Sequence, residues 1–281
     1  MLLGVQVSTE GKIYHAFQRA KDLGCNTMQI FSRNPQRWRE HFLEPKDIEE
    51  FKVDKIKFGI KPVFIHIPYL INLASPSPWL YQDSINAYIE DILEAQKLRA
   101  EYIVTHMGSH KETSEEAGLK RLTQALNIIL EKTQKTDVDI LLENTAGSGS
   151  WLGYKFSHHR QVIQGLNNKN RVGLCLDTAH AYLAGYDIAT REGLEVMLDE
   201  IDKTVGLNLL KLIHLNDAKD KLGSGRDRHE HIGKGKIGLE GMKRIINHPK
   251  LRNTAFILET PKDSEAADRM NLNRVRRLRK E

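Results

Sequence analysis

The chain has 281 residues, of which 40% are hydrophobic, and this is enough to bury one large core. Its formal net charge of +5 is compatible with a polyanionic partner, although charges of both signs are mixed along the chain. The two cysteines, Cys25 and Cys175, exclude a disulfide framework and a Cys-x-x-Cys motif. No apolar stretch reaches the ~18 residues of a membrane span, and no basic leader precedes the first apolar segment. We therefore expect a cytoplasmic protein with no membrane partner.

Eight short apolar segments alternate with segments of helical spacing. Strand character is found at 2–8, 27–31, 62–66, 102–106, 138–143, 172–177, 209–214 and 254–259. Helical spacing is found at 13–23, 47–58, 78–98, 119–130, 160–166, 192–205 and 239–246, and the basic segment 269–280 is expected to form the last helix. This alternation predicts an α/β protein with a single domain over residues 1–281, a (β/α)8 or TIM barrel, and not a sandwich or a bundle.

Six of the eight predicted strands end in a residue that can bind a metal ion. A strand that ends in Asp177 and turns into a helix would leave Asp177 and His180 at the same rim. The other five strand ends carry His66, His106, Glu143, His214 and Glu259. All strand C-termini of a (β/α)8 barrel open on one face, so these side chains are predicted to surround a single mouth.

A single strand-end histidine or carboxylate is usually a hydrogen-bonded polar residue or a helix cap, but six of them need a common explanation. Without cations they would leave several charges facing one another in one cleft. His180, together with Asp227 and His229 in the polar segment 216–236, brings more donors than one ion can use. Imidazole-rich sets without thiolates favour zinc or manganese over magnesium or calcium. A cluster of such ions is typical of phosphate-ester hydrolysis.

Five motifs together resemble the endonuclease IV family of zinc-dependent abasic-site endonucleases. They are Leu142-Glu143-Asn144-Thr145-Ala146-Gly147, Leu176-Asp177-Thr178-Ala179-His180, His214-Leu215-Asn216-Asp217-Ala218-Lys219, Asp227-Arg228-His229 and Ile257-Leu258-Glu259-Thr260. The resemblance extends from Gly4 to about Thr260. It implies a DNA-repair enzyme, deoxyribonuclease IV, which hydrolyses the phosphodiester 5′ to abasic sites in double-stranded DNA and leaves a 3′-hydroxyl and a 5′-deoxyribose phosphate. Removal of blocked 3′ ends would follow from the same chemistry, and we expect a monomer.

The resemblance also implies a trinuclear zinc site, with manganese possible at one or more positions. The implied ligands are His66, His106 and Glu143 for one ion, the bridging Glu143 with Asp177, His214 and Glu259 for a second, and His180, Asp227 and His229 for a third. Glu143 and Glu259 are the expected catalytic residues.

The expected DNA contacts are Tyr69, Leu70 and Arg37. Tyr69 and Leu70 lie in an unusually apolar loop and match family residues that penetrate the duplex at the lesion; the alternative is a loop packed on its own barrel. Arg37 stands beside Gln36, where the family usually has arginine. The first strand also departs from the family, because Gln6 replaces a histidine that supports the metal ligands. We expect altered hydrogen bonding there and no lost ligand.

Other polar residues are expected mainly at the surface. They are His15, His41, His110, His158, His159, His231 and His248, and the basic tail at 274–280, for which nonspecific attraction to DNA is the alternative.

The sequence is also compatible with two other functions. A metal-dependent sugar isomerase or epimerase on a related barrel would use fewer ligands, and it would not need Asp227, His229 or the Tyr69 loop. A DNA-binding protein without catalysis would fit the basic charge balance, but it has no use for a complete set of ligands.

Overall fold

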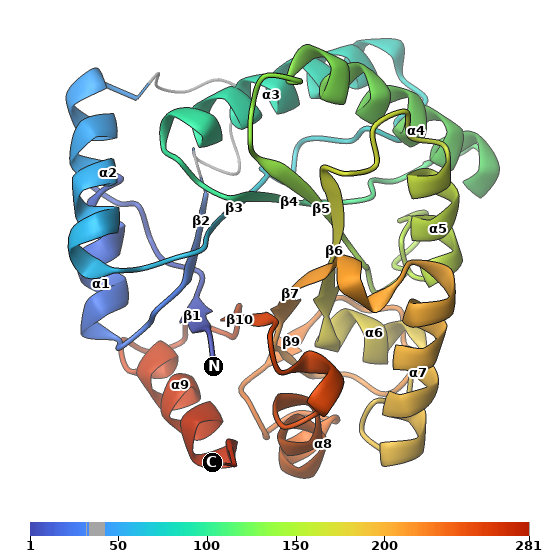
Figure 1. Ribbon diagram of the computed structural model, residues 1–281. Helices are drawn as coiled ribbons and strands as arrows, with labels where there is room; N and C mark the ends of the chain where they lie inside the picture. The colour runs from blue at the N-terminus through green and yellow to red at the C-terminus, as the bar shows by residue number, and fades with distance from the viewer. Residues whose placement is uncertain (32, 34–42, 281) are drawn as a thin grey trace.

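A computed structural model describes residues 1–31, 33 and 43–280, so the predictions for Gln36, Arg37 and His41 fall outside the described residues. Eight parallel strands form a ring, and helices surround it (Figure 1). The strands are β1 (Leu3–Val5), β2 (Met28–Phe31), β3 (Val63–His66), β4 (Tyr102–His106), β5 (Asp139–Glu143), β6 (Val172–Asp177), β7 (Leu210–His214) and β10 (Ala255–Leu258). The predicted TIM barrel is confirmed, although β1 and β10 are shorter than expected.

The order of the strands is β1-β10-β7-β6-β5-β4-β3-β2, which puts the first two strands at the two ends of the sheet. A parallel bridge between Gln6 and Gln29 joins these ends, and the Val7 N–H donates to the Gln29 carbonyl at 2.8 Å. The ring is therefore nearly closed. This closure brings residues just after β1 next to residues of β2.

Most of the helices lie close to their predicted positions, and one more begins directly after Asp177, where only a turn into a helix was expected. The helices are α1 (His15–Asp22), α2 (Pro45–Phe58), α3 (Pro78–Lys97), α4 (Glu115–Lys132), α5 (Phe156–Gln164), α6 (Thr178–Ala184), α7 (Arg191–Thr204), α8 (Gly238–Ile246) and α9 (Ala267–Leu278). Side-chain caps begin several of them: Ser77, Ser114 and Thr190 each accept a hydrogen bond from a backbone N–H three residues ahead. The predicted polar loop at 216–236 contains a short antiparallel hairpin of β8 (Asp217–Ala218) and β9 (His229–Glu230).

Alternation along the strands separates two hydrophobic clusters. On β6, Leu174 and Leu176 pack outward against the helices, whereas Cys175 points into the barrel. The other inward residues of the inner cluster are Phe64, Val104, Leu141, Leu212, Ala255 and Ile257. Each ligand predicted at a strand end stands two residues after one of these inward residues, so the pleat aims it into the mouth.

The burial of several histidines corrects one sequence-based expectation. His158, His159, His231 and His248 are buried, whereas His15 is exposed as expected. Hydrogen bonds explain how the imidazoles are tolerated inside: His158 accepts from the Gly153 N–H at 3.1 Å, and His231 accepts from the Asn271 side chain at 2.9 Å. None of the described helices combines the length and the apolar character needed to cross a membrane.

Candidate metal centre

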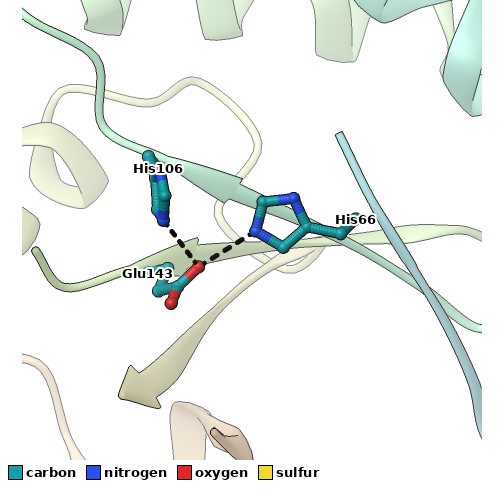
Figure 2. Close-up of side chains that lie close together, drawn as sticks. All are labelled: His66, His106 and Glu143. Atoms are coloured by element: carbon teal, nitrogen blue, oxygen red, sulfur yellow. Dashed lines mark hydrogen bonds and ion pairs between the residues drawn. The ribbon is translucent and has the colours of Figure 1, made fainter. Parts of the chain in front are cut away.

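Glu143 at the end of β5 is the hub of the site. Its side chain is fully buried, and its Oε2 lies 3.2 Å from His66 Nε2 and 3.2 Å from His106 Nε2. Figure 2 shows both imidazoles directed at this one oxygen. His106 and Glu143 are direct partners in the register of β4 and β5, and His66 comes from the adjacent β3. Three neighbouring strands therefore build the first group of donors.

The other oxygen of Glu143 takes part in a second group. His214 Nδ1 lies 2.9 Å from Glu143 Oε1 and 3.2 Å from Glu259 Oε2. Asp177 pairs with His214 in register, and the ligand atoms of these four residues lie within 4.8 Å of one another. Cys175 also approaches Glu143 and His214, but burial raises the pKa of its thiol to about 12, so it stays protonated.

A third group lies at the rim. His180 Nε2 is 3.0 Å and His229 Nε2 is 3.5 Å from Asp227 Oδ1, and His229 Nε2 is 3.6 Å from Asp177 Oδ2. The two histidines come from α6 and β9, and the Asp227 side chain is 51% exposed. We use the name metal centre for all nine residues, which are His66, His106, Glu143, Asp177, His180, His214, Asp227, His229 and Glu259.

The hydrogen bonds of the imidazoles fit metal binding. The Nδ1–H groups of His66, His180 and His229 can donate to the carbonyls of Ile67, Asn144 and Glu259 at 2.7, 2.9 and 3.0 Å. These bonds leave each Nε2 with a free lone pair. Within the described part of the chain, the buried Nε2 atoms of His180 and His229 have no hydrogen-bond partner. A lone pair that faces carboxylate oxygens needs a cation or a proton between them, so this donor set fits zinc.

The electrostatics of the metal centre favour charged forms despite burial. Burial alone would raise the pKa of Glu143, but His214, His106 and His180 lower it well below its ordinary value. Burial opposes a proton on His180, yet Asp177 and Asp227 raise its pKa well above the usual range. Burial likewise opposes a proton on His214, but the carboxylates of Glu259 and Glu143 raise its pKa well above the usual range. A metal ion that binds here must displace these protons.

Asp227 keeps its charge although part of it is enclosed. Burial would raise the pKa of its carboxyl group, but the close contact with His180 and the charges of the nearby histidines lower it to about 2. The Asp227 carboxylate is therefore charged at neutral pH and can serve as a ligand for a cation at the rim.

The loop after β3 has some side chains buried in the core and others exposed to solvent. Ile67 and Ile71 are buried on the barrel, Leu70 is half-buried, and Tyr69 is 59% exposed. The Tyr69 ring lies 5.7 Å from the ring of Phe31 and lines a pocket shared with His106, His180 and Asp227. Burial and nearby carboxylates raise the pKa of Tyr69 to about 12, which keeps its phenol neutral. The structure thus places this side chain between the metal centre and solvent.

Several residues that the sequence did not single out also contact the metal centre, among them Asn216, Trp151 and Gln29. The Asn216 side chain donates to Asp177 Oδ2 at 2.7 Å and accepts from the Glu259 N–H at 2.8 Å. The Trp151 ring lies edge-on to His106 at 5.8 Å. Gln29 binds two of the ligands. Two of these residues could have been noticed in the sequence, because Asn216 belongs to the motif that begins at His214 and Gln29 is a polar residue within an apolar strand. Nothing in the sequence distinguishes Trp151.

Comparison with known proteins agrees with this architecture. Residues 17–280 match the family described as xylose isomerase-like TIM barrel. A protein of Methanoculleus marisnigri named probable endonuclease 4 is 43% identical over 278 residues, with 99% of both chains covered. Its counterpart in Halothermothrix orenii is 42% identical over 264 residues, which cover 94% of this chain and 95% of that one.

A solved structure supports the same relationship. The crystal structure of endonuclease IV from Thermus thermophilus is similar with a TM-score of 0.88 and 34% identity, and the match covers 99% of this chain and 98% of that one. Relatives at this identity and coverage share both the fold and the enzyme class. The chain therefore belongs to the endonuclease 4 family and is an endonuclease.

Proposed function

We propose that this endonuclease repairs DNA by hydrolysing the phosphodiester 5′ to abasic sites in double-stranded DNA with a trinuclear zinc centre. Water adds to phosphorus and the bond from phosphorus to the 3′ oxygen breaks. The products are a 3′-hydroxyl and a 5′-deoxyribose phosphate. Blocked 3′ ends would be hydrolysed by the same chemistry, and the enzyme would act as a monomer. The observation that carries the proposal is the gathering of all nine predicted ligands at one mouth.

The proposed ligand sets follow the three groups of donors. His66, His106 and Glu143 would hold one zinc ion, Glu143 would be shared with a second held by Asp177, His214 and Glu259, and His180, Asp227 and His229 would hold a third. Manganese could replace zinc at one or more of these positions. When bound, zinc supplies Lewis acidity, which activates water and neutralises charge developing on the phosphate and the leaving oxygen.

The protein's own residues contribute positioning. Glu143 directs one oxygen at each of two donor groups, so it fixes the spacing between them. Glu259 is less buried than Glu143 and stands at the edge of the mouth, where a substrate phosphate can approach. These two are the proposed catalytic carboxylates. Tyr69 and Leu70 would enter the duplex at the lesion, with Arg37 as a further DNA contact.

The decisive test uses a duplex oligonucleotide with one tetrahydrofuran abasic analogue. This analogue cannot undergo β-elimination, so any incision must be hydrolytic. We expect incision 5′ to the analogue with a 3′-hydroxyl end, loss of activity after chelation, and recovery with zinc or manganese. Glu259→Gln should lower the rate at least about 100-fold while duplex binding persists, because a neutral amide is a poor replacement for an anionic zinc ligand.

Several outcomes would reject the proposal. Incision that resists chelation would remove the metal from the mechanism. A folded, zinc-loaded enzyme that leaves the analogue intact would favour a sugar isomerase or epimerase. Full turnover by Glu259→Gln would reject the role given to that carboxylate.

A further inference from the structure

Gln29 is a fully buried polar residue in β2 whose side chain reaches two residues of the metal centre. Its Nε2 donates to Glu259 Oε1 at 2.6 Å, and its Oε1 lies 2.8 Å from His214 Nε2. The same Nε2 also donates to Gln6 Oε1 at 2.8 Å. Both amide hydrogens and the amide oxygen of Gln29 are therefore engaged.

Chemistry fixes which way this amide points. A carboxylate only accepts hydrogen bonds, so the NH2 group of Gln29 must face Glu259, and its oxygen must face His214. The Nε2 of His214 must then carry the hydrogen. In the unprotonated imidazole, Nδ1 then has a lone pair, and this atom is the one that lies 2.9 Å from Glu143 Oε1 and 3.2 Å from Glu259 Oε2. Gln29 thus selects the imidazole tautomer that can bind a metal ion at this point.

Gln6 holds the amide of Gln29 in this orientation. Its own position is anchored by the barrel closure, since its N–H donates to the Leu258 carbonyl at 3.0 Å and its carbonyl accepts from Lys262 Nζ at 2.6 Å. A rotated Gln29 amide would point its oxygen at both Gln6 Oε1 and Glu259. Gln6 Oε1 is therefore a second acceptor, beside Glu259, that opposes rotation of the Gln29 amide.

His214 differs from His66, His180 and His229 in the kind of group that binds its second ring nitrogen. His66, His180 and His229 bond to backbone carbonyls, which no substitution removes, and they offer Nε2 to the metal centre. His214 bonds to a side chain and offers Nδ1. Among these four histidines, His214 is consequently the one whose tautomer can be changed by substituting a single partner residue, Gln29.

We propose that Gln29 is a positioning residue which, with its amide held by Gln6, fixes the Glu259 carboxylate and the Nδ1-binding tautomer of His214 for the ion between them. The inference rests on the proposed function in taking that ion to be zinc. Removal of the amide should weaken the binding of this ion about 10-fold to 100-fold, the usual effect of losing a partner that orients a metal ligand.

The test compares Gln29→Met with Thr27→Val. Methionine keeps the length of the side chain but has no amide. Thr27, just before β2, is also fully buried and donates to the Pro62 carbonyl at 2.6 Å, so Thr27→Val removes a buried hydrogen bond away from the metal centre. Zinc binding is measured by competition with a chelator, and imidazole tautomers by nitrogen NMR of the zinc-loaded protein. Gln29→Met should lose one tightly held zinc ion and one Nε2–H imidazole signal, whereas Thr27→Val should lose only stability.

A double-mutant cycle tests the part played by Gln6. Gln6→Leu should weaken zinc binding less than Gln29→Met does, and it should add little in the Gln29→Met background, because the two residues act through one hydrogen bond. Fully additive losses would overturn the role of Gln6. Unchanged zinc affinity and tautomers in Gln29→Met would overturn the inference while wild-type incision stands. Wild-type zinc binding without incision would instead overturn the proposed function alone.

Discussion

The surroundings of Tyr69 indicate how a DNA substrate would approach the metal centre. Its ring rests near Phe31 and His66, at centroid distances of 5.7 and 6.0 Å, while more than half of the side chain faces solvent. The residues on either side along the loop, Ile67 and Ile71, are buried and anchor it. An aromatic ring held on a rigid base and exposed beside anionic ligands is suited to contact an unstacked duplex.

Tyr69→Ala should therefore weaken discrimination of abasic from intact duplex about 10-fold to 100-fold, since loss of one aromatic contact with a base costs about 1–3 kcal/mol. Zinc content should stay at the wild-type level. Tyr69→Phe is the matched control, because it keeps the ring and removes only the hydroxyl group. Equal preference for abasic duplex in Tyr69→Ala and the wild type, measured by binding competition, would show that the ring does not enter the duplex.

At the scale of elements, one arginine in α9 and another just after it bond to the C-terminal ends of α1 and α8. Arg276 donates to the carbonyls of Leu23 and Gly24 at 2.9 and 2.8 Å, at the C-terminus of α1. Arg279 bonds to the Ile246 carbonyl at the end of α8. Gly24 has φ +70°, and a Cβ there would lie 3.0 Å from the Arg276 guanidinium group. The tail expected as a solvated helix face thus satisfies helix ends that lack partners of their own.

Arg276→Ala should lower the free energy of unfolding by about 1 kcal/mol, since it removes two hydrogen bonds from an exposed cation to helix-terminal carbonyls. Arg277→Ala removes the same charge from the adjacent residue, which makes no such bond to the described residues, and is the control. Urea denaturation of both variants measures the difference. Equal stability of the two variants would contradict this role of Arg276, and an equal loss of DNA affinity in both would assign the charge to nonspecific attraction.

At the scale of the whole molecule, the metal centre is built from residues of many different strands and loops of the barrel. Its ligands come from β3, β4, β5, β6 and β7 and from the segments that follow β6, β7 and β10, so their charges are balanced only when the entire ring is assembled. Binding of the proposed zinc ions and folding should therefore support each other. The coupling should depend on pH, because the pKa values of His180 and His214 are raised above the ordinary value of about 6.5.

The direction of the pH dependence follows from the raised pKa values of His180 and His214. Their protonated forms stabilise the metal-free fold fully below about pH 6.5, and this contribution is lost as the pH rises through the raised pKa values. Zinc needs the unprotonated nitrogens, so its binding strengthens over the same range. The difference in Tm between zinc-loaded and chelated enzyme should grow by several degrees from about pH 6.5 upward, at about 2–4 °C per kcal/mol. Differential scanning calorimetry measures it.

His15→Asn, which changes an exposed histidine, should show the same growth as the wild type. A Tm difference that stays constant or shrinks with rising pH would mean that zinc does not displace these protons.

Much of the barrel and the positions of the residues at its mouth could be predicted, because both follow from local patterns. Strand alternation is a property of consecutive residues, so an inward hydrophobic residue followed two positions later by a ligand, as in Phe64 and His66 or Leu141 and Glu143, can be recognised without tertiary contacts. The helix caps Ser77 and Ser114 are equally local. The burial of His158 was not predictable, because its partner is a loop N–H that packing alone brings near.

The strand ends alone are enough to predict which residues meet at the mouth, because parallel strands in a barrel bring all their C-terminal residues to one face. How those residues are held depends on tertiary contacts. Gln29 lies 23 positions from Gln6 and 230 positions from Glu259, and these side chains meet only because β1, β2 and β10 close the ring. Hydrogen bonds depend on distances of a few ångströms and on donor direction, which no spacing along the chain specifies.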